Sequence, residues 1–236
     1  MTQNERLQNL MPPMALHSDT TPCVIRGEGC YLYTEDGRKI LDFASGIACN
    51  ALGHCHPKII AAAEKQLHTL IHAGHNVLYY EPYTTLVEKL VEKTGGKYKV
   101  YFSNAGAEAN EGAMKLAKYA THRPVIISMK NAFHGRTMAT ATITTSTAAY
   151  RKYYEPMMPS VYFAEYPYLF RTPYKMADGK CPKEYMTQFD DLFKKVVDPS
   201  MVAGIIMAPI QGEGGYVAPP VEWRQYVRDL CDTHGI

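Results

Sequence analysis

The sequence lacks the features that define several large classes of protein. No apolar run in its 236 residues approaches the ~20 residues that a membrane-spanning helix needs, so we expect no membrane partner. The formal net charge of +2 provides no broad basic surface, so we expect no nucleic-acid partner. Residues 1–16 contain no basic segment followed by an apolar core, so we expect no secretory signal and a cytoplasmic location.

Metal-binding patterns are also scarce. The six cysteines include no Cys-x-x-Cys pair, and in a long chain without an export signal we expect them to be reduced thiols. His54, Cys55 and His56 lie together in the sequence, with Cys49 nearby, which at first suggests zinc. Their spacing fits no closed zinc pattern, and no second ligand cluster follows at a usual interval. We therefore predict no metal site.

The common nucleotide-binding loops are missing from the stretch that most resembles a phosphate site. Small residues fill Ser103–Ala107, between a predicted strand over residues 99–102 and a helical pattern that begins at Glu108. Neither Gly-x-Gly-x-x-Gly nor Gly-Lys-Ser/Thr occurs there. A helix N-terminus nevertheless offers unpaired N–H groups and a positive dipole end to a phosphate. Many strand-to-helix turns bind nothing, so this pattern needs support from elsewhere in the chain.

Regular alternation of short apolar runs and helical patterns follows residue 98. Strands are expected over residues 99–102, 124–129, 160–164 and 202–208, and helices over residues 108–119, 184–196 and 221–233. This order predicts an α/β fold with a mostly parallel sheet and helices on both faces. Ligands of such sheets bind at the carboxyl ends of the strands.

The first part of the chain does not show this alternation of strands and helices. Residues 1–55 predict an arm and a small antiparallel unit, whose hairpin signal is Asp36-Gly37. Two helices follow, over residues 58–72 and 83–93, each preceded by a proline suited to the first helical position.

Polar and glycine-rich segments follow two of the predicted strands. Residues 131–137 bring an aromatic side chain, Phe133, and a cation, Arg136, which could cover a planar ring and clamp a carboxylate. The alternative is that Phe133 belongs to the core and Arg136 to the surface. Residues 209–216 add Glu213 among three glycines, at the same edge of the sheet. Together with residues 103–107, small or polar residues therefore follow three predicted strands, and this pattern favours a ligand site.

These segments resemble motifs of the class III pyridoxal-phosphate aminotransferases, the relatives of 4-aminobutyrate, ornithine and acetylornithine aminotransferases. The matching segments are 36–43, 53–57, 103–110, 132–137 and 209–215. The likeness runs from about Val24 to the end of the chain. It implies a fold-type I transferase in which residues 1–55 belong to a small domain and residues 56–236 form an incomplete large domain that binds pyridoxal 5'-phosphate.

The resemblance also implies how the cofactor is held. Gly106 and Ala107 would donate backbone N–H groups to the phosphate. Phe133 would stack on the pyridine ring, with His134 alongside. The active site would lie between the two subunits of a homodimer.

Substrate roles follow from the same resemblance. Arg136 would bind a substrate carboxylate, Ile47 would border the substrate pocket, and Glu213 would pair with an arginine for one substrate and release it for the other. The implied reaction transfers an amino group from an ω-amino acid or diamine-type donor to 2-oxoglutarate. Relatives usually carry glutamate where this sequence has Ala208, which implies an altered substrate end.

Two family residues have no counterpart in this chain. The lysine that forms the Schiff base, and the aspartate that pairs with the pyridinium nitrogen, fall beyond the position of Ile236. The resemblance therefore implies no catalytic residue within residues 1–236 and no transamination by this chain alone. Alternatives of the same fold are an aminomutase or a racemase, and the alternative of another class is a fragment or subunit that binds only a phosphate ligand or a partner chain.

Overall fold

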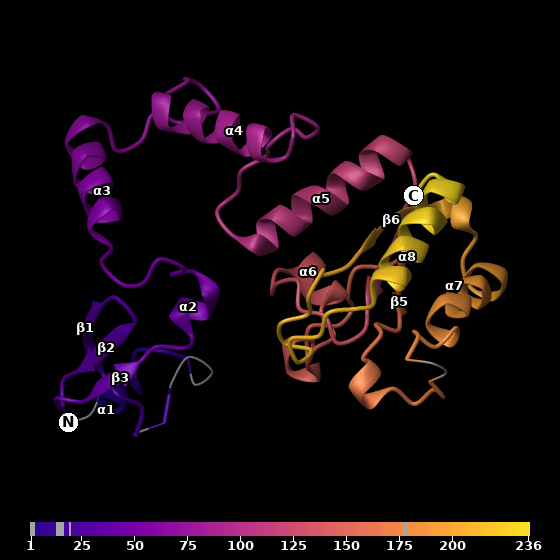
Figure 1. Cartoon of the computed structure of the whole chain (residues 1–236), viewed down its shortest axis with the longest axis horizontal. Coiled ribbons are helices and arrows are strands. Elements are labelled where there is room, and N and C mark those ends of the chain that lie inside the picture. Colours follow the sequence, from indigo (N-terminus) through magenta and orange to yellow (C-terminus); the bar gives the residue numbers. More distant parts are fainter. Residues whose placement is uncertain (1–2, 13–16, 19, 177–178) are drawn as a thin grey trace. The chain divides into compact units, whose positions relative to one another are not determined.

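Two compact units make up the chain, Met1–Tyr98 and Lys99–Ile236 (Figure 1). The computed structural model describes residues 3–12, 17–18, 20–176 and 179–236, so the expected N-terminal arm lies partly outside the described residues. The expected domain boundary after residue 55 falls inside the first unit, and the assignment of residues 56–98 to a large domain stays a prediction.

The first unit contains the predicted antiparallel sheet. Its strands are β1 (Val24–Glu28), β2 (Tyr31–Thr34) and β3 (Lys39–Leu41), paired in the order β1-β2-β3. The β2–β3 hairpin turns at Gly37, whose φ of +83° is a conformation that favours glycine. The hairpin signal in the sequence is thereby confirmed.

The helices of the first unit are α1 (Gln3–Leu7), α2 (Ser45–Ala48), α3 (Pro57–Thr69) and α4 (Glu81–Lys93). Proline occupies the first turn of both α3 and α4, as the sequence predicted, because the N–H that proline lacks has no intrahelical acceptor there. Neither α3 nor α4 has a buried residue. Their apolar faces are therefore not covered within this unit.

The second unit is built on a parallel sheet with the strand order β5-β4-β6. Its strands are β4 (Val125–Met129), β5 (Val161–Ala164) and β6 (Val202–Ile206). The expected strand over residues 99–102 is wrong, because that segment pairs with none of the described strands. The other three predicted strands are confirmed to within two residues.

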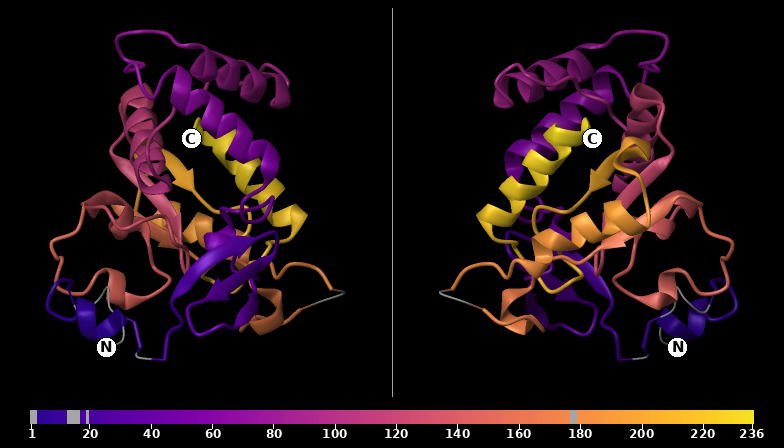
Figure 2. Two further views of the ribbon diagram at one scale, coloured as in Figure 1. Left: turned by 90° about the vertical axis from the view of Figure 1, so that its left-hand side faces the viewer. Right: turned by 90° about the vertical axis from the view of Figure 1, so that its right-hand side faces the viewer.

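Helices cover both faces of this sheet, as expected. They are α5 (Gly106–Thr121), α6 (Met138–Ile143), α7 (Glu184–Lys195) and α8 (Val221–His234), joined by single 3-10 turns η2 (Ala148–Tyr150), η3 (Leu169–Arg171) and η4 (Pro199–Met201). Alternate residues of β4 face opposite layers: Val125, Ile127 and Met129 pack with α7 and α8, whereas Ile126 packs with α5 and α6. Figure 2 shows β6, the gold strand, between α5 and α8.

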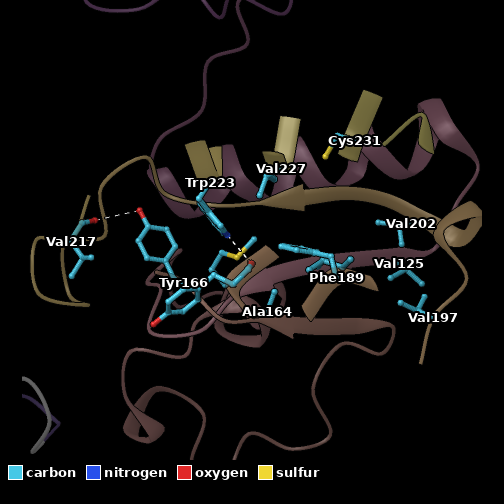
Figure 3. Close-up of a cluster of buried hydrophobic side chains, with 13 residues drawn as sticks. Val125, Ala164, Tyr166, Phe189, Val197, Val202, Val217, Trp223, Val227 and Cys231 are labelled. Carbon is cyan, nitrogen blue, oxygen red and sulfur yellow. Dashed lines mark hydrogen bonds between the residues drawn. The ribbon is translucent and has the colours of Figure 1, made fainter. Parts of the chain in front are cut away.

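The larger core cluster also secures the segment that follows β6 (Figure 3). Trp223 of α8 is fully buried and donates its Nε1–H to the carbonyl of Tyr185 at 3.0 Å. The ring of Tyr166 meets the Trp223 indole edge-on, and its hydroxyl lies 3.3 Å from the carbonyl oxygen of Val217. The polar loop after β6 is therefore anchored to the apolar core.

Candidate functional site

A cavity of about 490 Å³ lies where the loop after β4 meets the beginning of α5. Its lining residues are Gly106, Ala107, Asn110, Phe133, His134, Gly135, Arg136 and Thr137. The structure thus brings together five residues that the sequence singled out, from two segments about 25 positions apart in the chain.

The beginning of α5 leaves backbone donors available to this cavity. Ala105 precedes the helix in an extended conformation and provides no side-chain cap. The first helical hydrogen bond runs from the N–H of Ala109 to the carbonyl of Ala105, at 3.0 Å. Within the described part of the chain, the N–H groups of Gly106 and Ala107 have no acceptor, as expected for the first turn of a helix. They suit an anion.

Three hydrogen bonds fix the loop after β4, one to α5 and two to Thr144 at the end of α6. The Asn110 side chain donates to the carbonyl of His134 at 2.8 Å. The N–H of His134 donates to the Thr144 hydroxyl at 2.9 Å, and this hydroxyl donates to the carbonyl of Gly135 at 3.0 Å. Asn110 and Thr144 were not predicted. Asn110 lies one helical turn after Gly106, a spacing that could have identified it, whereas Thr144 gives no such signal.

Gly135 allows this close approach. A Cβ atom at this position would lie 2.6 Å from the Cβ of Ala107 and 2.6 Å from the Thr140 hydroxyl, and its φ is +128°. No other residue type fits here without a shift of the backbone. The glycine therefore sets the distance between the loop and the helix N-terminus.

His134 is buried in the cavity wall, with 8% of its surface exposed. Burial lowers the pKa of its imidazole, so the neutral form is favoured. Its Nε2 atom is buried and has no hydrogen-bond partner. Because buried polar atoms in native proteins are nearly always satisfied, this nitrogen indicates a place where a ligand or water completes the site.

Phe133 and Glu213 are connected through Tyr150. The Phe133 and Tyr150 rings have centroids 5.3 Å apart at 60°. The Tyr150 hydroxyl lies 3.2 Å from one Glu213 oxygen, and the Ser146 hydroxyl donates to the other at 2.5 Å. Burial, and then the contact with Glu213, raises the pKa of Tyr150. Glu213 is thus held beside the cavity rather than in its wall.

Two predicted site residues remain, Arg136 and Ile47. Arg136 is exposed at the cavity and makes no ion pair with any described residue. Ile47 belongs to the first unit, so its relation to the cavity stays a prediction.

The family model described as aminotransferase class-III matches residues 14–236. The chain belongs to the class III aminotransferases. The predicted family membership is thereby confirmed. This aminotransferase chain is 40% identical, over 214 residues, to the probable 4-aminobutyrate aminotransferase of Bacillus subtilis, covering 90% of this chain and 49% of that protein. It is likewise 40% identical, over 217 residues, to the acetylornithine aminotransferase of Gloeobacter violaceus, covering 89% and 48%.

Solved aminotransferase structures share the fold. A Bacillus anthracis aminotransferase matches with a TM-score of 0.85 and 32% identity, over 98% of this chain and 52% of that one. The taurine:2-oxoglutarate aminotransferase of Bifidobacterium kashiwanohense, solved with PLP and glutamate, matches with a TM-score of 0.87 and 25% identity, over 100% and 54%. The expected fold-type I architecture is confirmed, and the chain spans about half the length of the relatives it matches.

Neither a metal cluster nor a membrane-spanning helix is found among the described residues. In the described part of this aminotransferase chain, no three His, Cys, Asp or Glu side chains gather as a metal site would require. No helix among the described residues is long and apolar enough to cross a bilayer.

Proposed function

We propose that this chain is the cofactor-binding part of an aminotransferase that uses pyridoxal 5'-phosphate. The proposed reaction moves an amino group from an ω-amino acid or diamine-type donor, such as 4-aminobutyrate, ornithine or acetylornithine, to 2-oxoglutarate. The observation that carries the proposal is the cavity in which free N–H donors of α5 face the segment Phe133–Arg136. The names of the two curated relatives support the choice of donor class.

The residues of the cavity fit pyridoxal phosphate. A phosphate ester matches the unpaired N–H groups of Gly106 and Ala107 at the positive end of α5. The half-exposed ring of Phe133 can cover a planar heterocycle, and the unpartnered Nε2 of His134 has room for a polar neighbour. A volume of about 490 Å³ suits a molecule of this size.

When bound, pyridoxal phosphate supplies an electron sink that stabilises negative charge on the carbon bearing the amino group. The chain's own residues then have separate tasks. Phe133 excludes water from one face of the site, and His134, in its neutral form, adds no charge beside it. Arg136 forms no ion pair with a described residue, so its guanidinium can bind a substrate carboxylate.

Glu213 is proposed to switch between substrates. Its carboxylate is held by the hydroxyls of Ser146 and Tyr150, both of which are neutral partners. It is therefore free to pair with a cation when one substrate is bound and to release that cation for the other. Ile47 is proposed to border the substrate, as the family resemblance implies.

We propose that a polypeptide limited to residues 1–236 does not catalyse transamination. The lining of the cavity contains no lysine, and pyridoxal-phosphate enzymes require one as covalent anchor and base. This observation favours a second candidate function for that polypeptide alone, which is binding of a phosphate ligand or a partner chain. An aminomutase or racemase of the same fold is the other alternative.

The homodimer and the cytoplasmic location also belong to this proposal. Apolar side chains exposed on α3 and α4 support a partner surface in the first unit. All six cysteines are free thiols, which supports a reducing compartment.

The test compares wild type with Arg136→Ala in the protein as expressed from its gene. We expect the KM for 2-oxoglutarate to rise roughly 10–100-fold, as for loss of a charged hydrogen bond, with pyridoxal phosphate retained. Arg228→Ala is the matched control, because Arg228 lies on α8 in an exposed pair with Asp232. Equal loss of cofactor and substrate binding would contradict the role of Arg136. A wild-type protein that neither changes the visible spectrum of pyridoxal phosphate nor exchanges amino groups would overturn the proposed function.

A further inference from the structure

The ring of Phe133 is the part of the cavity wall that no hydrogen bond can fix. The backbone on either side of it is held: the carbonyl of Ala132 accepts the N–H of Ser146 at 3.1 Å. The N–H of His134 donates to the Thr144 hydroxyl at 2.9 Å. The ring itself lines the cavity and is 37% exposed. Because a phenylalanine ring has no polar atom, the side chains packed against it determine its orientation.

Tyr150, in the 3-10 turn η2, packs against this ring. The two ring centroids lie 5.3 Å apart and the ring planes meet at 60°, within the range in which aromatic pairs attract. Tyr150 is held at both ends: its N–H donates to the carbonyl of Thr147 at 3.4 Å, and its hydroxyl donates to Oε1 of Glu213 at 3.2 Å. The plane of the tyrosine ring therefore depends on where the Glu213 carboxylate lies.

The loop after β6 places that carboxylate relative to β4. Gln211 is 3% exposed, and its side-chain N–H donates to the carbonyl of Lys130, the residue after β4, at 2.8 Å. Gly214 passes the next carbonyl closely, since a Cβ atom there would lie 3.0 Å from the Asn131 oxygen. The acceptor for the tyrosine hydroxyl is therefore carried by a loop that is fixed to the strand end from which Phe133 follows.

We propose that Tyr150 is a positioning residue whose hydroxyl, held by Glu213, sets the orientation of the Phe133 ring in the cavity wall. The loop after β6 thereby controls how the cavity receives a planar ring. When Glu213 takes another partner, the tyrosine loses its acceptor and the Phe133 ring gains freedom. Tyr150 touches no reacting atom in this scheme and acts through Phe133.

The consequence for a ligand rests on the proposed function, because it assumes that the planar ring is that of pyridoxal phosphate. The chain of contacts from Glu213 through Tyr150 to Phe133 rests on the distances alone. The two parts therefore need separate experiments, one without a ligand and one with a ligand.

The first experiment follows the ring of Phe133 by NMR in the ligand-free protein, expressed from its gene with labelled phenylalanine. Phe133→Leu identifies the signal. Glu213→Ala and Glu213→Gln remove the same charge, but only glutamine keeps an oxygen that can accept from Tyr150. We expect Glu213→Ala to shift the Phe133 signal and Glu213→Gln to leave it at the wild-type position. An unshifted signal in Glu213→Ala, or equal shifts in both variants, would overturn the proposal.

The second experiment measures the Kd of 4-deoxypyridoxine 5'-phosphate by calorimetry. This compound has the ring and phosphate of the cofactor but no aldehyde, so its binding needs no lysine. We expect Tyr150→Phe to weaken binding about threefold to tenfold, as for loss of an ordinary hydrogen bond. Tyr153→Phe is the matched control, because it removes the hydroxyl of a neighbouring tyrosine that is 88% exposed. Equal Kd values for Tyr150→Phe and wild type would overturn the proposal.

A double-mutant cycle separates positioning from a general structural role. In a Phe133→Leu background, Tyr150→Phe should weaken binding no further, because it acts through Phe133. Additive losses would overturn the proposal. A wild type that neither binds 4-deoxypyridoxine 5'-phosphate nor transfers amino groups would overturn the proposed function instead. The NMR signal of Phe133 in the Glu213 variants would then still decide whether Glu213 sets the ring.

Discussion

The two compact units differ most in how much apolar surface they bury. In the second unit every residue of β4 is buried, and thirteen buried side chains form one cluster between the sheet, α7 and α8. In the first unit, Thr34 alone is buried among the described residues. Large apolar side chains such as Ile71 and Val77 are exposed there. The second unit has a hydrophobic core of its own, whereas the first unit leaves large apolar side chains exposed.

This difference shows what the sequence pattern of each unit encodes. The helices α3 and α4 have apolar residues at helical spacing, yet helices of this length are marginal in water unless an apolar face is covered. Among the described residues of the first unit, nothing buries these apolar faces. The uninterrupted apolar run of β4 specifies contacts within the second unit, since a central parallel strand is covered on both faces.

The largest expected effect comes from a matched pair of phenylalanines. Phe189 of α7 is fully buried, whereas Phe43 of the first unit is 90% exposed. We expect Phe189→Ala to lower the free energy of unfolding by about 3–5 kcal/mol through lost burial and a cavity. Phe43→Ala should change it by less than about 0.5 kcal/mol. Urea unfolding of both variants measures the difference, and equal losses would mean that a partner covers the first unit in solution.

The second-largest expected effect concerns Gly135, at the cavity of the second unit. In Gly135→Ala, the new methyl group would meet Ala107 and Thr140 at 2.6 Å, so the loop after β4 must move away from α5. We expect pyridoxal phosphate to bind roughly 10–100-fold more weakly, the equivalent of an overpacking cost of about 1–3 kcal/mol. Gly212→Ala is the control, because a Cβ atom there meets nothing within 4 Å. Unaltered cofactor affinity in Gly135→Ala would contradict the requirement for glycine.

Local signals predicted the elements, and long-range contacts explain what was missed. Proline at the first turn and apolar periodicity located α3 and α4 to within a few residues, and the strand β4 was found from its apolar run. The segment 99–102 looked like a strand in isolation, but a strand exists only if a neighbouring strand pairs with it.

The sequence likewise predicted the motifs that line the candidate site but not the residues that hold them in place. Residues of the 103–110 and 132–137 motifs line one cavity because strand ends and helix beginnings meet at one edge of a parallel sheet. The residues that hold Glu213 were not found, because they lie far from it along the chain: Ser146 is 67 positions away and Tyr150 is 63.

A smaller effect tests how the core of the second unit secures the loop after β6. The hydroxyl of Tyr166 lies within 3.0–3.4 Å of the carbonyls of Ala208, Pro209 and Val217. Tyr166→Phe should lower the free energy of unfolding by about 1–2 kcal/mol, because the carbonyl of the buried Val217 and the part-buried carbonyls of Ala208 and Pro209 lose a donor. Faster amide exchange over residues 209–217 would locate the loss, and unchanged exchange there would contradict it.

The same side chain gives a pH dependence. Burial raises the pKa of Tyr166 to about 12, above the ordinary value of 10.0. The folded state therefore keeps a proton that the unfolded state has lost between about pH 10 and pH 12. The contribution to stability is complete below pH 10 and disappears as the pH rises to 12. Tyr166→Phe should flatten this decline in unfolding experiments, while Tyr79→Phe, on an exposed tyrosine, should not.

The smallest expected effect concerns Thr34, the one buried residue among those described in the first unit. The hydroxyl of Thr34 accepts the N–H of Arg38 at 3.0 Å across the β2–β3 hairpin. Thr34→Val removes that acceptor, and we expect a loss of about 0.5–1.5 kcal/mol confined to the hairpin, because no core of the first unit transmits it further. Amide exchange at Arg38 should rise while exchange in β4 stays constant; Thr69→Val, at an exposed site on α3, is the control. If exchange in β4 rises as well, the two units unfold together, and the contrast in burial does not correspond to independent stability.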